Sequence, residues 1–195
     1  RLLSENRWPF RLHATYDESI QRALSVYEKV NQAFPLKGLH WFFDHAETIS
    51  PASIDRVKKL GGGIAIQNRM AFQGEYFIDR YGKKATLNTP PIKAILAAGI
   101  PVGMGTDATR VSSYNPWLCL YWLTTGKSIG GTKLYDETNI LSRELALELY
   151  TRGSAWFSNE ENKKGSFLPG QFADFAVINQ NYFTVIVKVV PKAAP

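Results

Sequence analysis

The sequence predicts an α/β protein with a parallel sheet, and three observations lead to that fold class. Short apolar runs bounded by glycine or proline alternate along the chain with longer segments whose apolar residues recur at helical spacing. The composition, 45% hydrophobic and 13% aromatic over 195 residues, is typical of a globular chain that buries a core. Because parallel strands are joined by crossover segments, this alternation favours βαβ units with helices outside the sheet.

Strands and helices are expected in regular succession along the chain. The strands are predicted over residues 10–14, 41–46, 63–68 and 101–107, and the helices over residues 17–34, 51–60, 90–98, 115–126 and 142–157. Asp17 is expected to cap the first helix, and Ser142 the last. Ser50 followed by Pro51 opens the second helix and Gly61 ends it, because a hydroxyl cap and a first-turn proline favour a helix start and glycine favours a helix end.

The pattern changes near residue 160. Residues 164–170 are rich in turn formers, whereas residues 173–178 and 184–190 are rich in strand-forming residues. These runs predict a small appended β region over residues 161–195, after an α/β portion over residues 1–160.

A long connection separates the third strand from the next helix. Residues 69–88 contain Arg69, Phe72, Tyr76 and Phe77 among charged side chains. Connections of this length inside compact domains usually serve a function, and the aromatic content disfavours disorder. Two interpretations stay open: a lid or substrate-facing wall, and a short surface helix over residues 74–82.

Charge and apolar content exclude several classes of protein. The net charge of +6 is dispersed over isolated lysine pairs, which argues against a nucleic-acid partner. No run of about 18 apolar residues is present, which argues against a membrane span. The single Cys119, inside an apolar run, predicts a buried thiol in a reducing, cytoplasmic compartment. The first residues do not resemble a signal peptide, and the missing initiator Met suggests a processed or excised chain.

Polar side chains with catalytic potential recur where predicted strands end. His13, His45, Gln67 and Asp107 each close one of the four strands. Carboxyl ends of parallel strands meet at one edge, where ligands bind. Imidazole and carboxylate are usual ligands of zinc and its neighbours, so His13, His45 and Asp107 are candidate metal ligands.

Structural roles compete with this interpretation. A single histidine at the end of an apolar strand is more often a hydrogen-bonded structural residue, and a single aspartate after Gly-Thr is more often a cap or turn former. His40 opens a strand and is assigned a structural role. Gly126-Lys127-Ser128 imitates the end of a phosphate-binding loop, but that motif requires glycine where Tyr121 stands.

Four ordered motifs stand out along the chain: His13-Ala14-Thr15-Tyr16-Asp17, Asp44-His45-Ala46-Glu47, Pro101-Val102-Gly103-Met104-Gly105-Thr106-Asp107-Ala108, and Lys164-Gly165-Ser166 with Pro169-Gly170-Gln171-Phe172-Ala173-Asp174. Together they resemble the second half of a metal-dependent amidohydrolase, of the YtcJ-like group that includes N-substituted formamide deformylase. The resemblance covers residues 8–185. It implies a (β/α)8 barrel of which residues 1–160 supply strands five to eight, followed over residues 161–195 by part of a small β-sandwich-like domain.

The resemblance also implies a chemistry. His13 and His45 would bind a divalent metal, zinc above others, which would activate water for the hydrolysis of a non-peptide amide. Asp107 would approach the metal and act as general base. Gln67 and Arg69, with Phe72 and Tyr76, are candidate substrate-binding residues on a small-molecule amide.

The departures from the family pattern define an alternative. The His-x-His pair of the first barrel strand and the ligand of the fourth strand have no counterpart in this chain. Glu47 stands where many relatives have an amide, and Thr15-Tyr16 replaces a common Ile-Gly. The alternative is a non-catalytic barrel fragment that is inactive alone and pairs with its missing N-terminal half or with a second copy.

Overall fold

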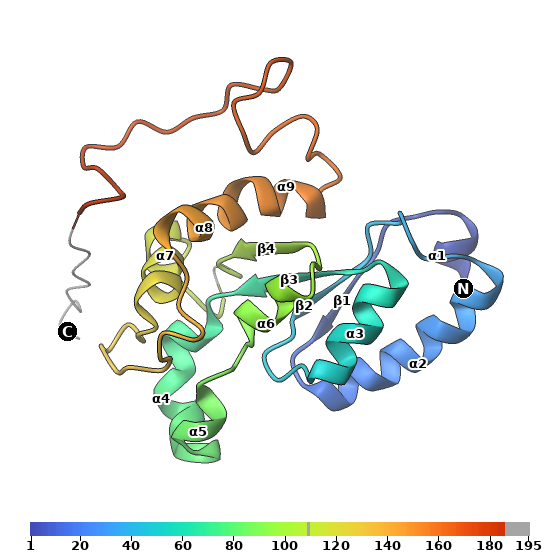
Figure 1. The fold of residues 1–195 in the computed structure, drawn as a ribbon, viewed down its shortest axis with the longest axis horizontal. Helices are drawn as coiled ribbons and strands as arrows, with labels where there is room; N and C mark the ends of the chain where they lie inside the picture. Colours follow the sequence, from blue (N-terminus) through green and yellow to red (C-terminus); the bar gives the residue numbers. More distant parts are fainter. Residues whose placement is uncertain (109, 186–195) are drawn as a thin grey trace.

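The computed structural model describes residues 1–108 and 110–185 and contains one four-stranded sheet. The strands are β1 (Arg11–Ala14), β2 (Phe42–His45), β3 (Gly63–Gln67) and β4 (Val102–Gly105). All neighbours are parallel and their order follows the sequence, β1-β2-β3-β4. The register places His13 opposite Asp44 and Gln67 opposite Gly105. The predicted α/β fold with a parallel sheet is confirmed (Figure 1).

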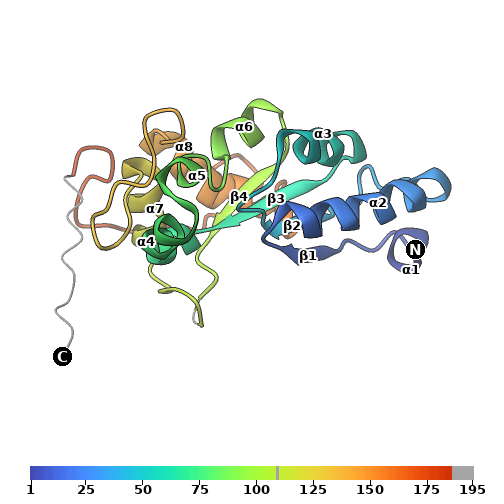
Figure 2. The ribbon, with the colours of Figure 1, turned by 90° about the horizontal axis from the view of Figure 1, so that it is seen from below.

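Helices connect and flank the strands. They are α1 (Leu2–Glu5), α2 (Asp17–Ala33), α3 (Pro51–Leu60), α4 (Arg69–Tyr81), α5 (Lys83–Thr86), α6 (Ile92–Ala97), α7 (Pro116–Thr125), α8 (Arg143–Glu148), a π-helical turn (Leu149–Gly153) and α9 (Ser154–Phe157). Helices α2 and α3 run side by side along one side of the sheet, whereas α8 and α9 run past β4 (Figures 1 and 2). Arg56 Nε donates to Glu28 Oε1 at 2.7 Å and ties α3 to α2. None of the described helices has the length and apolar character needed to cross a bilayer.

Helix α3 shows how the sequence sets the helix boundaries. Ser50 Oγ accepts a hydrogen bond from Ser53 N at 3.2 Å, and Gly61 ends the helix with a φ of 71°. Asp17 departs from its predicted role, because Tyr16 is the cap position of α2 and Asp17 is the first helical residue. Asp17 Oδ1 instead accepts from Ser50 N at 2.9 Å. The carboxylate therefore fastens the start of α3 to the start of α2.

The core lies between the sheet and its helices. Its largest fully buried side chains include Trp41, Trp122, Phe43 and Ile64. Cys119 is also buried, as predicted, and burial raises the pKa of its thiol to about 12. The thiol stays protonated at neutral pH and packs as a small apolar side chain.

The two edges of the sheet differ. Ser154 Oγ accepts from Met104 N at 3.2 Å and donates to Met104 O at 2.8 Å, so it occupies both backbone groups of Met104 beside β4. A Cβ on Gly153 would lie 2.4 Å from Val102 O, and glycine therefore lets this turn approach the strand closely. The outer edge of β1 has no strand partner within the described residues.

Two predicted segments differ from the structure. Residues 69–88 form α4 and α5 and so resemble the predicted surface helix more than a loop, although α4 begins at Arg69 and not at residue 74. The helix begins earlier than predicted because Met70 and Ala71, in its first turn, are buried in the core. Gly74 lets α4 approach the chain at Leu134, whose Cδ2 would lie 2.5 Å from an added Cβ.

The predicted strand over residues 173–178 is wrong, because this segment is irregular and exposed. No neighbouring strand accepts its backbone hydrogen bonds within residues 161–185, and an isolated strand is not stable in water. The second predicted run begins with residues 184 and 185, which are not in a strand, and its residues 186–190 lie outside the described part. The appended β domain over residues 161–195 stays a prediction.

Candidate functional site

The carboxyl ends of the strands carry an unusual backbone. His45, the last residue of β2, has a φ of 78°, and Ala46 after it has a φ of 52°. Asp107, two residues beyond β4, has a φ of 54°. Residues other than glycine adopt this left-handed backbone conformation at a cost of about 1–3 kcal/mol each, and such residues cluster at functional sites. Two of the three predicted strand-end ligands, His45 and Asp107, are held this way.

The structure brings the two predicted metal-ligating histidines together. The imidazole centroids of His13 and His45 are 4.5 Å apart, and their planes meet at 73°. His13 is exposed, whereas His45 is 6% exposed and its buried Nδ1 has no hydrogen-bond partner. Burial, and secondly the charge of His13, lower the pKa of His45. A neutral imidazole with a free nitrogen is the form that binds a metal ion.

Asp107 lies near this pair but does not complete a metal cluster. Its charge raises the pKa of His45 in opposition to burial, which places the carboxylate within electrostatic range of the imidazole. Asp107 is exposed. No group of three His, Cys, Asp or Glu side chains arranged to hold a metal occurs in residues 1–108 and 110–185.

A groove follows one face of the sheet toward Asp107. Its sheet side carries the polar residues Arg11 and Asp44 at β1 and β2, and Gln67 and Asp107 at β3 and beyond β4. Ser154, Phe157 and Ser158, at α9 and directly after it, line the same groove. Arg11 Nε donates to Asp44 Oδ2 at 2.8 Å. Gln67 Oε1 is buried and has no hydrogen-bond partner. The predicted substrate-binding residue Gln67 thus lines the same groove as the proposed base.

The other predicted substrate-binding residues divide into two groups. Arg69 Nε donates to Gln73 Oε1 at 2.9 Å, and its charge lowers the pKa of His45, so Arg69 lies close to the histidines. Phe72 packs against the core, and Tyr76 is 64% exposed on α4. Neither aromatic side chain lines the groove.

Two buried polar residues that follow β2 and β3 were not predicted as site residues. Glu47 is 3% exposed, neither carboxylate oxygen has a partner, and burial raises its pKa to about 7. Asn68 is fully buried, and both of its amide atoms lack partners. In the sequence, only the position of Glu47 two residues after His45 pointed to a role in the site. The burial of its carboxylate depends on how the chain folds after β2. There, Thr48 N donates to Thr15 O at 3.2 Å and draws the segment against β1.

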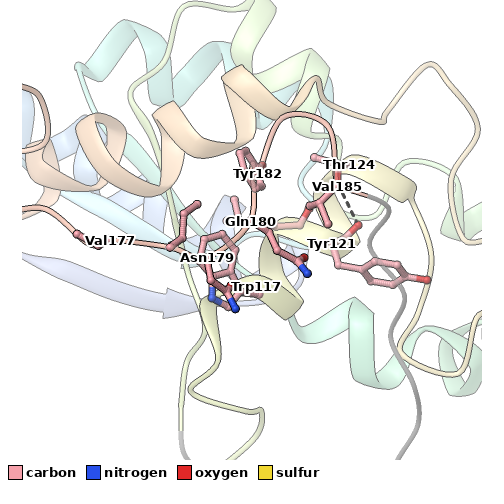
Figure 3. Close-up of a pocket in the computed structure, with 10 residues that line it drawn as sticks. Trp117, Tyr121, Thr124, Val177, Asn179, Gln180, Tyr182 and Val185 are labelled. Carbon is pink, nitrogen blue, oxygen red and sulfur yellow. Dashed lines mark hydrogen bonds between the residues drawn. The ribbon is translucent and has the colours of Figure 1, made fainter.

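A different pocket forms between α7 and residues 177–185 (Figure 3). Its volume is about 520 Å³, and Trp117, Tyr121 and Tyr182 are among its lining residues. None of the predicted site residues lines it. Trp117 therefore faces a pocket away from the histidines, while Trp122 is fully buried in the core.

Comparison with known proteins identifies the family. The profile of the amidohydrolase family matches residues 1–193. The chain belongs to the amidohydrolase family. YtcJ of Bacillus subtilis (strain 168), which is named as an amidohydrolase, is 27% identical over 177 residues, which cover 89% of this chain and 33% of YtcJ. The resemblance expected from the four motifs is confirmed.

Solved structures share the fold of this family member. An uncharacterized metal-dependent hydrolase from Pyrococcus horikoshii OT3 matches with a TM-score of 0.75 and 25% identity over 90% of this chain and 34% of that chain. A mutant of the atrazine chlorohydrolase TrzN from Arthrobacter aurescens TC1, complexed with zinc and atraton, matches with a TM-score of 0.62 and 18% identity over 89% of this chain and 36% of that chain. The amidohydrolase chain thus spans about a third of the length of these relatives.

Proposed function

We propose that residues 1–160 supply strands five to eight of a (β/α)8 barrel, and that residues 161–195 begin an appended β domain. The parent protein is a metal-dependent hydrolase that cleaves carbon–nitrogen bonds in non-peptide amides. The observation that carries this proposal is the pairing of the His13 and His45 imidazoles, 4.5 Å apart, at the carboxyl ends of adjacent parallel strands. The name of the Pyrococcus horikoshii protein, a metal-dependent hydrolase, supports the same assignment.

The residues present fit part of a zinc site. His45 offers a buried nitrogen without a partner, and His13 offers a second, exposed imidazole beside it. Asp107 supplies an oxygen donor nearby, and the remaining ligands would come from the other part of the protein. Mixed imidazole and carboxylate donors favour Zn²⁺. When bound, such an ion supplies Lewis acidity toward the scissile carbonyl and toward water.

The side chains of this chain would carry the proton transfers and the orientation of the substrate. Asp107, exposed at the end of β4, accepts a proton from the attacking water and returns it to the leaving amine nitrogen. Gln67 Oε1, which has no partner, accepts a hydrogen bond from the substrate. Arg69 adds positive charge beside the histidines, which favours the neutral form of His45.

Replacement of Asp107 tests the proposal. Asp107→Asn keeps the size of the side chain but cannot accept the proton, so we expect kcat/KM to fall by about 10²- to 10⁴-fold while the fold and most of the metal binding remain. Hydrolysis of N-acyl, N-formyl and cyclic amides by the metal-loaded protein is the measurement. Asp79→Asn, an exposed carboxylate on α4, is the matched control. Unchanged turnover in Asp107→Asn would eliminate this general base.

The alternative is a non-catalytic barrel fragment. Two observations favour it: the described residues bring only two histidines together, and the chain covers about a third of the length of its relatives. Under this alternative the chain pairs with its missing N-terminal half or with a second copy. Metal analysis separates the two. A chain that holds no zinc, manganese or iron, even after addition of the N-terminal half, would exclude the hydrolase.

A further inference from the structure

A second groove lies beyond the carboxyl ends of the strands. It has a volume of about 720 Å³ and separates α4 and α5 from the first turns of α2, α3 and α6 (Figure 1). Its lining is largely apolar and includes Ile49, Pro51, Ile54, Phe77, Pro91 and Ala94. Ile49 and Ile54 are buried members of the core, so the groove leads to the apolar interior. Volumes of about 300–1,000 Å³ are typical of sites that bind small molecules.

One wall of this groove comes from the long segment between β3 and α6, for which the sequence left a substrate-facing wall open. Phe77 and Tyr81 on α4 and Ala85 on α5 line the groove, and the ring centroids of Phe77 and Tyr81 are 4.6 Å apart. Tyr16, at the start of α2, also lines it. Burial, and secondly the hydroxyl of Tyr81, raise the pKa of Tyr16. These two exposed tyrosines therefore lie close together and bridge α4 to α2 at the rim of the groove.

The groove begins close to the histidine pair. Tyr16 and Thr48, which both line it, come three residues after His13 and His45. Three residues span at most about 11 Å between Cα atoms, so the groove starts within that distance of the histidine backbone. The charge of Arg69 acts on the pKa of both Tyr16 and His45, which places this guanidinium within electrostatic range of the groove and of the imidazoles. A substituent a few bonds long therefore joins the two places.

We propose that this groove binds a bulky apolar substituent of the substrate, so that the substrates are amides that carry a hydrocarbon ring or branched chain beyond the scissile bond. This inference rests on the proposed function, because it assigns the scissile amide to the histidine pair. A ring that enters the groove leaves water and packs against Ile54 and Phe77. An amide without such a group gains none of this burial and binds more weakly.

Binding of two matched amides tests this assignment without catalysis. The probes are N-(cyclohexylethyl)acetamide and N-ethylacetamide, which share the amide and the spacer and differ by the ring. Each is titrated into the metal-free chain and followed by NMR chemical shifts. A fully buried methylene group strengthens binding about fourfold, and a groove buries part of a ring, so we expect the ring-bearing amide to bind about ten- to a hundredfold more tightly.

Two variants fill the groove from opposite walls. Ala94 on α6 and Ala85 on α5 are exposed alanines that line it, so Ala94→Phe and Ala85→Phe place a ring in the groove and leave the core intact. Each variant should lose the preference for the ring-bearing amide while its circular dichroism spectrum stays unchanged. The matched control is Ala97→Phe, at an exposed alanine of α6 that does not line the groove, and it should keep the preference.

Three results would overturn the apolar site. The first is equal binding of the two amides by the unmodified chain. The second is a preference that survives in both groove-filling variants, because the ring would then bind elsewhere, as in the pocket beside Trp117. The third is a preference that also disappears in Ala97→Phe, because the loss would then not depend on the groove.

The outcomes also separate this inference from the proposed hydrolase. Hydrolysis of small amides by the metal-loaded parent protein, with no gain for the ring-bearing amide, would leave the hydrolase intact and reject the role of the groove. Absence of hydrolysis of any amide would reject the hydrolase, while the metal-free titration would still decide whether the groove binds an apolar ring.

Discussion

The two ends of the sheet are built differently. At the amino end, Trp41 is fully buried and its Nε1 donates to Leu60 O at 3.2 Å, and His40 Nε2 pairs with Glu161 Oε1 at 3.0 Å. At the carboxyl end, buried polar atoms of His45, Glu47, Gln67 and Asn68 lack partners. Six of the eight unpartnered buried side-chain atoms among the described residues belong to these four residues.

This difference separates stability from function. Polar groups buried without partners cost free energy, so a fold keeps them only where another requirement overrides stability. In parallel α/β proteins the carboxyl ends of the strands carry the chemistry, and the opposite ends contribute to stability. The amidohydrolase chain follows this division, because its unpaired buried imidazole, carboxylate and amide atoms share the carboxyl end.

The largest expected effect is at the amino end. Trp41→Ala removes a fully buried indole that contacts Tyr27 and Phe43, so we expect the free energy of unfolding to fall by about 3–5 kcal/mol. Urea unfolding followed by circular dichroism measures this change. Trp8→Ala, at a residue that is 58% exposed, should cost much less. Similar losses in both variants would contradict the assignment of the amino end to stability.

The next effect concerns the pH dependence created by Glu47. Its pKa is about 7 in the folded chain and near 4.5 when unfolded, so the folded state binds more protons between these values and stability falls as pH rises. The loss across this window is about 3 kcal/mol at most. Glu47→Gln should remove it and stabilise the metal-free chain at pH 8 relative to the unmodified chain.

Unfolding at pH 5 and pH 8 measures this Glu47 effect. Glu137→Gln, at an exposed residue, is the control and should leave the pH dependence unchanged. If Glu47→Gln changes the free energy of unfolding by the same amount at pH 5 and at pH 8, the carboxyl group of Glu47 is not buried as described.

The smallest effect is a pKa change within the histidine pair. Burial and, secondly, the charge of His13 lower the pKa of His45, so His13→Ala should raise that pKa only part of the way to its ordinary value, because burial remains. NMR titration of the imidazole resonance measures it. His40→Ala, at the other end of the sheet, should leave the pKa of His45 unchanged. A lowered pKa also means that His45 costs stability as pH falls below its ordinary value, which is opposite to Glu47.

Local patterns in the sequence predicted most of the fold. The expected strand over residues 41–46 became Phe42–His45, and Ser50 and Ser142 cap helices as expected. Residues 173–178 have the same strand-forming composition but no neighbouring strand, and they stay irregular. Composition thus predicts a strand only where another strand is available to pair with it.

The candidate site was predicted in part. The parallel register brought His13 and His45 together, since His13 is the last but one residue of β1 and His45 is the last residue of the adjacent β2. The burial of Glu47 and Asn68 depends on the path of the chain after β2 and β3, which has no local pattern. Phe72 was expected at the substrate, but its partly buried ring packs against the core. An aromatic residue on a helix can serve either role, and the sequence pattern does not distinguish them.

The contact between Ser154 and Met104 has a consequence for self-association. A sheet with two open edges can add neighbours without limit and grow into a fibre, whereas a sheet with one open edge accepts a single neighbour and then stops. Ser154 occupies the backbone groups of Met104 at the β4 edge, so an added strand joins freely beside β1 but pairs with β4 only after it displaces this hydroxyl. Closure of the proposed barrel at β4 therefore requires one serine side chain to leave the strand edge.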